Sequence, residues 1–418
     1  MPLQGVSDYP CRARRDGDGW FIETNFGTPV TLTLAPDESG GLTGVMVQSG
    51  VEMPARLQPI TLEALDRDRR PQTPKPPFPY REIEAVVQHP DGHRLAGTLV
   101  LPEGVERPPV AVLITGSGPQ DRDESLMGHR PFLVLADHLA RNGIATLRCD
   151  DRGFGASTGE FSSATTSDFA GDVLAAVAWL RQRDDIDPTA IGLIGHSEGG
   201  LVAPMAIAED PGIAFAVLMA GTGVDGGRVL TSQSERLMEV QGLDRSVIDP
   251  IVVLHAELMD LVREEAADEA VAAAFLALTD AQVEASRADL GDEQADRMRA
   301  EVRARLETDP RPLTPWMLEF IRTDPRTYLS RMSCPVLAIN GTDDIQVISG
   351  LNLPEIERAV TTGGGRIEII EYPGLNHLFQ RSETGSITEY AEIETTIEPE
   401  VLRDIADWIG RVTRRDAP

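Results

Sequence analysis

One segment constrains the fold of this chain more than any other, because it joins a buried strand to a buried helix through a serine. An apolar run at 191–194 leads into Gly195-His196-Ser197-Glu198-Gly199, and the apolar, alanine-rich stretch 201–208 follows. This order predicts a strand that turns into a helix within about one residue, with a strained backbone at Ser197. Glycines on both sides keep side chains out of the crowded turn. The pattern indicates a nucleophilic serine at the carboxyl end of a sheet, beside the positive end of a helix.

A second copy of the Gly-x-Ser-x-Gly pattern, at 155–159, lacks this context. It follows the polar, glycine-rich segment 150–154, and no apolar helix start comes after it. We therefore interpret Ser157 as a loop residue and Ser197 as the nucleophile.

Alternating buried strands and helices predict a mostly parallel α/β sheet. The continuous apolar run 110–114 is typical of a strand buried on both faces, and 132–142 has the spacing of an amphipathic helix. The alternation stops after the strand 215–220 and resumes at 335–339. The residues in between are rich in Ala, Glu, Asp and Arg at helical spacing, which predicts an all-helical insertion.

The N-terminal part reads differently. Strand-like segments at 20–24, 29–34 and 42–47 precede a proline-rich linker at 71–79. We expect four segments: an N-terminal β-rich domain at 1–75, the first part of an α/β core at 80–225, a helical cap inserted at 226–330, and the second part of the core at 331–418.

Charge and composition exclude several kinds of partner. The 418 residues carry a net charge of −29, which disfavours nucleic acid and anionic membrane surfaces. No stretch is apolar enough to insert into a membrane, and the first eight residues lack the pattern of a signal peptide. The three cysteines are widely spaced without a CxxC, so we expect neither a disulfide framework nor a metal site. We expect a cytoplasmic location. A homo-oligomer is compatible with the sequence.

A serine hydroxyl needs a base within hydrogen-bond reach and a carboxylate that orients that base. In a fold of this kind the chain order is serine, acid, histidine. Two histidines follow the serine: His255 lies at a helix-face position within the insertion, whereas His377 follows a buried strand in a loop defined by Pro373 and Gly374. We predict His377 as the base, because ligands bind at the carboxyl ends of such strands.

The acid should follow the strand that ends at Asn340, where both Asp343 and Asp344 are candidates. We favour Asp344, because a turn that starts at Gly341 returns that side chain toward the site. Asp343 would instead cap the turn or lie in solvent. The residues alone give little preference between the two.

A developing oxyanion needs two backbone donors. One is the amide of Glu198, directly after the nucleophile. The second should come from the loop 115–123, whose glycines allow close approach to a ligand. We predict the amide of Ser117, with that of Gly118 as the alternative, and place Gly116 and Gly118 at the substrate pocket.

Two other features are open to a functional or a structural interpretation. The carboxylate of Glu198 could recognise a substrate amine, but we favour a structural hydrogen bond, with Arg152 as a candidate partner. Trp316 and Phe320 are candidate pocket walls, although such a stripe also suits ordinary packing.

Taken together, these motifs resemble a large bacterial group of α/β-hydrolases that includes carboxylesterases and proteins termed serine-aminopeptidase-like or dienelactone-hydrolase-like. The matching segments run in the order of that group over about 80–418: 116–123, 150–155, 192–200, 340–347 and 375–380. In the group's pattern the acid precedes x-Gln-Val, which points to Asp344. The resemblance implies an α/β-hydrolase fold with a helical cap, and members often carry an N-terminal β-rich segment.

The resemblance also implies a serine hydrolase that cleaves small-molecule carboxylic esters through an acyl-enzyme, with no metal or organic cofactor. A peptidase that releases small N-terminal residues is the alternative within enzymes. A non-catalytic binding scaffold is the alternative from another class, and the complete triad of Ser197, Asp344 and His377 counts against it. Caps vary most in this group, so the sequence leaves the acyl and alcohol groups open.

Overall fold

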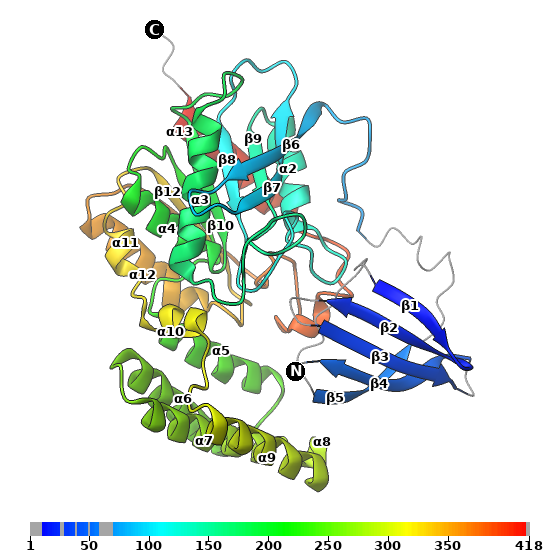
Figure 1. Cartoon of the computed structure of the whole chain (residues 1–418). Helices are drawn as coiled ribbons and strands as arrows, with labels where there is room; N and C mark the ends of the chain where they lie inside the picture. Colours follow the sequence, from blue (N-terminus) through cyan, green and yellow to red (C-terminus); the bar gives the residue numbers. More distant parts are fainter. Residues whose placement is uncertain (1–10, 26–28, 38–39, 49–50, 58–69, 415–418) are drawn as a thin grey trace.

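The computed structural model describes residues 11–25, 29–37, 40–48, 51–57 and 70–414. The expected N-terminal β-rich domain lies partly outside these residues. The first eight residues, where we expect no signal peptide, lie wholly outside them. The described chain contains two sheets and a group of helices (Figure 1).

The larger sheet has eight strands in the order β13-β12-β11-β10-β8-β9-β7-β6. Strands β8 to β13 pair in parallel, and the hairpin β6–β7 joins them antiparallel through β9. The central strands are buried along their whole length, which explains their unbroken apolar sequences. The strands are β6 (Tyr80–Gln88), β7 (Arg94–Pro102), β8 (Val110–Ile114), β9 (Ala145–Cys149), β10 (Ile191–His196), β11 (Ala216–Met219), β12 (Val336–Gly341) and β13 (Ile367–Tyr372).

Helices cover both faces of this sheet, as the alternation of the sequence predicts (Figure 1). Successive strand residues such as Val112 and Leu113 enter opposite cores. In the second core Trp408 packs edge-on against Phe215, with ring centroids 6.3 Å apart. One face carries α3 (Thr166–Arg181), α4 (Gly199–Glu209) and α12 (Ser349–Thr362), and the other carries α2 (Pro131–Arg141) and α13 (Pro399–Thr413). The chain therefore has the α/β-hydrolase fold.

The helical cap is inserted between β11 and β12 and has an apolar core of its own. Its helix α10 begins at Pro315, after Thr314, whose side chain accepts a hydrogen bond from the amide of Met317 at 3.2 Å. The cap comprises α5 (Gly226–Val240), α6 (Arg245–Arg263), α7 (Asp268–Ala285), α8 (Arg287–Leu290), α9 (Asp292–Thr308), α10 (Pro315–Arg322) and α11 (Arg326–Leu329).

The smaller sheet is an antiparallel meander of five strands in chain order. The three segments expected as strands are its middle strands. The two outer strands were not predicted, because β1 is polar and exposed along its length and β5 contains Pro54. The strands are β1 (Cys11–Asp16), β2 (Gly19–Asn25), β3 (Pro29–Pro36), β4 (Leu42–Gln48) and β5 (Val51–Leu57).

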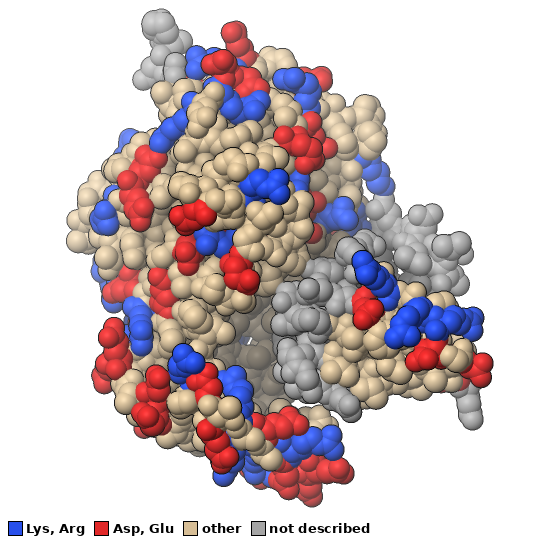
Figure 2. All heavy atoms as spheres, in the orientation of Figure 1, with Lys and Arg blue, Asp and Glu red and all other residues tan. Residues whose placement is uncertain are grey.

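The surface carries many acidic side chains (Figure 2), and the cysteines are unpaired, as we expect from the sequence. Acidic side chains are scattered over the core and the helical cap on the face drawn in Figure 2. Among the described residues, no helix combines the length and apolarity needed to cross a bilayer. All three cysteines are free, with Cys334 buried, Cys149 partly buried and Cys11 exposed.

Candidate active site

Ser197 lies in the sharp turn between β10 and α4 that the sequence predicts. Its backbone φ is +55°, in the left-handed region, and its amide donates to the carbonyl of Met219 at 2.8 Å. A Cβ at Gly195 would lie 2.0 Å from the carbonyl oxygen of Gly199, and one at Gly199 would lie 2.3 Å from that of Ile114. Side chains at either glycine would therefore break the turn, which holds Ser197 at the carboxyl edge of the sheet.

His377 and Asp344 come from the loops after β13 and β12 and meet beside the same edge. The Nδ1 of His377 lies 2.8 Å from Oδ2 of Asp344, whose side chain is fully buried. The other oxygen of Asp344 accepts the amides of Gln346 and Val347 at 2.8 and 2.9 Å. Asp343 instead accepts a hydrogen bond from the neighbouring Thr342. Of the two candidate acids, Asp344 is thus the one that orients the histidine.

His377 packs against the residue before the serine and makes no hydrogen bond to the serine itself in the described part of the chain. The His377 ring lies 4.7 Å, centroid to centroid, from that of His196, the residue before Ser197. Within the described part of the chain, no hydrogen bond joins the Ser197 hydroxyl to His377. Such contacts are often long without substrate and shorten when substrate is bound.

The loop 115–123 lies against the nucleophile. A Cβ at Gly116 would be 3.2 Å from the Cβ of Ser197, so only glycine fits there without displacement. Across the described residues, the amides of Ser117 and Glu198 donate to no protein acceptor. Both amides predicted as oxyanion donors are therefore available to a ligand, whereas the amide of Gly116 already donates to Glu124.

A buried network, not singled out from the sequence, ties this loop to the serine and the histidine. Oε1 of Glu124 accepts the Gly116 amide and faces Nδ1 of His196, each at 2.9 Å. The Nε2 of His196 lies 2.9 Å from the carbonyl oxygen of His377. Burial lowers the pKa of His196, but Glu124 and the His377 carbonyl outweigh burial, so the pKa is raised. A signal was available, since His196 lies inside the Gly-x-Ser-x-Gly motif.

The same loop is braced by the segment 150–153. Asp151 accepts hydrogen bonds from the Thr115 hydroxyl and the Gln120 amide, each at 2.8 Å. Asp150 accepts two from the guanidinium of Arg122, both at 2.9 Å. These contacts hold the loop 115–123 in place beside the nucleophile.

The carboxylate of Glu198 is buried beside the nucleophile and binds two donors on one oxygen. They are the Thr166 hydroxyl and the indole N–H of Trp316, each at 2.7 Å from Oε1. Burial raises the pKa of Glu198, and these hydrogen bonds lower it in part. The suggested partner Arg152 was wrong, because its guanidinium instead binds Asp172 at 2.6 Å.

Through this hydrogen bond, Trp316 connects the helical cap to the residue after the nucleophile. Phe320 is buried and stacks on Trp316, with ring centroids 5.5 Å apart. A second contact comes from Glu319, which accepts hydrogen bonds from the amide and hydroxyl of Ser167 at 3.0 and 2.5 Å. Helix α10 therefore rests on the start of α3 and on the residue after Ser197.

A cavity of about 60 Å³ lies next to the loop 115–123. Gly116, Gly118 and Glu198 line it, together with apolar residues of β8 and α3, whereas Trp316 and Phe320 do not. Ser197 is not among its lining residues either. The cavity is thus a neighbour of the nucleophile and does not enclose it.

The rejected alternatives have structural partners. Ser157 accepts the amide of Ala96 at 2.9 Å and donates to the Asp150 carbonyl at 2.7 Å. His255, in α6, lies 2.9 Å from the Thr231 hydroxyl. Both side chains are engaged away from the Asp344–His377 pair.

Comparison with known proteins identifies relatives among hydrolases. The family model described as X-Pro dipeptidyl-peptidase (S15 family) matches residues 91–353. Esterase EstD of Thermotoga maritima is 25% identical over 317 residues, which cover 75% of this chain and 65% of EstD. The chain thus spans less than two thirds of the length of that relative. The putative hydrolase YtaP of Bacillus subtilis is 29% identical over 184 residues, covering 40% of this chain and 58% of YtaP.

Solved structures with similarity include an esterase of Pyrococcus furiosus, with a TM-score of 0.45 and 15% identity over 81% of this chain and 92% of that one. A dienelactone hydrolase of Anabaena variabilis has a TM-score of 0.44 and 16% identity, over 81% of this chain and 100% of that one.

Proposed function

The chain belongs to the S15 family of X-Pro dipeptidyl-peptidases, and on this premise we propose that it is a serine hydrolase that cleaves carboxylic esters through an acyl-enzyme. The observation that carries the proposal is the buried pair of His377 and Asp344, 2.8 Å apart, beside a serine held at a positive φ. A packing histidine has no need of a buried carboxylate at Nδ1, whereas a base that must accept a proton at Nε2 does.

In the proposed reaction Ser197 attacks the acyl carbon while Nε2 of His377 takes the hydroxyl proton. Asp344 holds the Nδ1 proton and stabilises the imidazolium. The amides of Ser117 and Glu198 donate to the oxyanion, and each such donor contributes about 3 kcal/mol to the transition state. His377 then protonates the leaving alkoxide. It next takes a proton from a water that attacks the acyl carbon, and it returns this proton to the Ser197 oxygen as the carboxylic acid is released. The steps use protein groups and water alone.

We propose small-molecule esters as the substrates, because an alkoxide leaves with less assistance than an amine. The name of the relative EstD supports this choice. We further propose a cytoplasmic location, which the free cysteines support.

The second candidate is a peptidase that releases N-terminal residues. The description of the family favours it, and so does the buried carboxylate of Glu198, which could accept a substrate ammonium group beside the nucleophile. The two candidates share the same nucleophile and differ in the leaving group and in the need for a free amine.

Two substrates tested on the purified chain separate these candidates. We expect turnover of p-nitrophenyl butyrate and much slower turnover of alanyl-prolyl p-nitroanilide; the reverse order would favour the peptidase. Replacing Ser197 by Ala should lower turnover by about 10⁴–10⁶-fold, whereas Ser157→Ala should leave it unchanged. If the Ser197 variant stays within tenfold of the wild type, the proposed nucleophile is wrong. Absence of turnover together with no labelling of Ser197 by a fluorophosphonate would favour a binding scaffold.

A further inference from the structure

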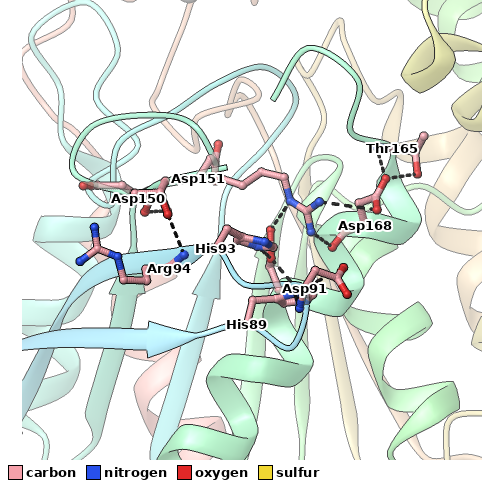
Figure 3. A network of polar contacts seen from close by, with 12 residues as sticks. His89, Asp91, His93, Arg94, Asp150, Asp151, Thr165 and Asp168 are labelled. Atoms are coloured by element: carbon pink, nitrogen blue, oxygen red, sulfur yellow. Dashed lines mark hydrogen bonds and ion pairs between the residues drawn. The ribbon is translucent and has the colours of Figure 1, made fainter. Parts of the chain in front are cut away.

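Three potential metal ligands converge where the turn between β6 and β7 meets α3. His89 follows β6, His93 precedes β7, and Asp172 lies on α3. One ligand atom of each lies within 4.8 Å of the others. His89, Asp91 and His93 are seen together in Figure 3. The cluster is outside the proposed active site, and nothing in the proposed reaction uses it.

The hairpin between β6 and β7 aims both imidazoles at one oxygen. The amide of His89 donates to the carbonyl of His93 at 3.0 Å, which fixes the turn. The two rings stack with centroids 4.2 Å apart and planes 19° apart. Their Nε2 atoms lie 3.8 Å (His89) and 2.7 Å (His93) from Oδ1 of Asp172. The two imidazole nitrogens and the carboxylate oxygen supply three of the four ligands of a tetrahedral site.

From this convergence we propose that His89, His93 and Asp172 bind one divalent transition-metal ion of the Zn²⁺ type, through both Nε2 atoms and Oδ1. Zn²⁺ bonds of about 2.0–2.1 Å in tetrahedral geometry separate neighbouring ligand atoms by about 3.3 Å. The observed separations of 2.7 and 3.8 Å lie on either side of that value. Changes of about 0.5–0.6 Å would bring these two separations to that value. The ligand nitrogens of the two histidines already lie within 4.8 Å of each other, and water would be the fourth ligand.

The surroundings leave room and access for an ion. The residue before Asp172 is Gly171, where a Cβ would lie 3.4 Å from Nε2 of His89, so no side chain crowds that nitrogen. The three ligand side chains are 9%, 11% and 11% exposed. The site is thus open enough for an ion to enter and buried enough to hold its ligands in place.

Neighbouring groups suit the second coordination shell. Nε of Arg152 binds Oδ2 of Asp172 at 2.6 Å, which fixes the carboxylate and leaves Oδ1 for the ion. Nδ1 of His89 accepts the amide of Asp91 at 3.1 Å, so the neutral ring carries its proton on Nε2. Metal binding at Nε2 requires the proton on Nδ1, so the hydrogen bond from the Asp91 amide would have to break. The carboxylate of Asp91, 3.5 Å from Nδ1, would then accept the Nδ1 proton.

The proposal revises the expectation that the chain has no metal site. That expectation rested on the spacing of the cysteines, whereas these ligands are two histidines and an aspartate about 80 residues further along the chain. Asp172 also lines the cavity beside the loop 115–123, so the proposed metal site and that cavity share one residue.

Zn²⁺ titration of the chelator-treated full chain by isothermal calorimetry tests the site. We expect one equivalent to bind, and His89→Ala and His93→Ala each to weaken binding at least about tenfold. His138→Ala, a histidine in α2, is the matched control and should bind like the wild type. Far-ultraviolet circular dichroism without metal checks that each variant is folded.

Substitution with Co²⁺ distinguishes this site from a thiolate site. We expect visible bands without the near-ultraviolet charge-transfer absorption of a cobalt–thiolate bond. The proposal is overturned if the wild type binds no Zn²⁺, if both folded histidine variants bind it as tightly as the wild type, or if thiolate absorption appears in the Co²⁺ form.

Discussion

Replacing Glu124 by Gln tests the buried network that ties the loop 115–123 to the nucleophile turn. Oε1 of Glu124 accepts the Gly116 amide and faces Nδ1 of His196, each at 2.9 Å. Glutamine keeps the shape and one acceptor oxygen but removes the charge. Hydrogen bonds to charged groups contribute about 1 kcal/mol more than neutral ones. With two such bonds, the variant should lose about 2 kcal/mol of unfolding free energy when His196 is charged.

The loss should depend on pH in a defined direction. Burial lowers the pKa of His196, yet Glu124 and the His377 carbonyl outweigh burial, so the folded pKa lies above the ordinary histidine value of 6.5. A histidine with a raised folded pKa stabilises the fold fully below its unfolded pKa. That stabilisation is lost as the pH rises through the folded pKa. The gap between wild type and Glu124→Gln should therefore be widest below about pH 6.5 and narrow at alkaline pH.

Urea unfolding followed by circular dichroism at pH 6 and pH 9 measures this gap. Glu106→Gln, at an exposed position, is the control and should show no gap at either pH. The kcat for p-nitrophenyl butyrate should also fall, by about 10–100-fold, because the hydrogen bond that anchors the loop carrying the Ser117 amide becomes weaker when its acceptor is neutral. An equal loss of stability at both pH values, or an unchanged kcat, would refute this reasoning.

The remaining predictions concern the acid and the contact with the cap. Asp344→Asn should lower kcat by about 10⁴-fold, because it favours the wrong tautomer of the catalytic histidine. Asp343→Asn should change kcat less than tenfold, and steady-state kinetics with the reverse ranking would reassign the acid. Trp316→Phe removes the indole N–H from the buried carboxylate of Glu198, so the unfolding free energy should fall by about 1–3 kcal/mol. A melting temperature equal to that of the wild type would show that this hydrogen bond adds nothing.

The parts of the site that could be predicted from sequence are those encoded by short segments. The nucleophile turn depends on Gly195, Ser197 and Gly199, which lie within five residues. Asp344 follows the buried strand β12, and His377 follows β13, which lies at the edge of the sheet and is only partly buried, contrary to expectation. The two strands pair in parallel, which brings their carboxyl ends to one edge. For these residues, the local sequence pattern and the rule that parallel strands end at one edge were sufficient to predict the triad.

The parts that sequence reasoning missed depend on pairing between distant residues. Glu124 meets His196 across 72 positions, and Trp316 meets Glu198 across 118. A carboxylate gives no local signal of which donor it will face, so Arg152 was a reasonable but wrong partner for Glu198. The outer strands of the small sheet were missed for a related reason, since their pairing follows from neighbours and not from their own alternation.

The hydrogen bond between Trp316 and Glu198 links the residue after the nucleophile to the position of helix α10 in the helical cap. Were α10 to lift, the carboxylate would lose a donor while Thr166 alone remained on that oxygen, in surroundings that already oppose its ionisation. Its proton affinity would rise, and the amide of the same residue would lose a constraint. Movement of the helical cap away from the core would therefore also loosen the nucleophile turn. A chain with α10 displaced should be a poor catalyst even though Ser197, Asp344 and His377 are all present.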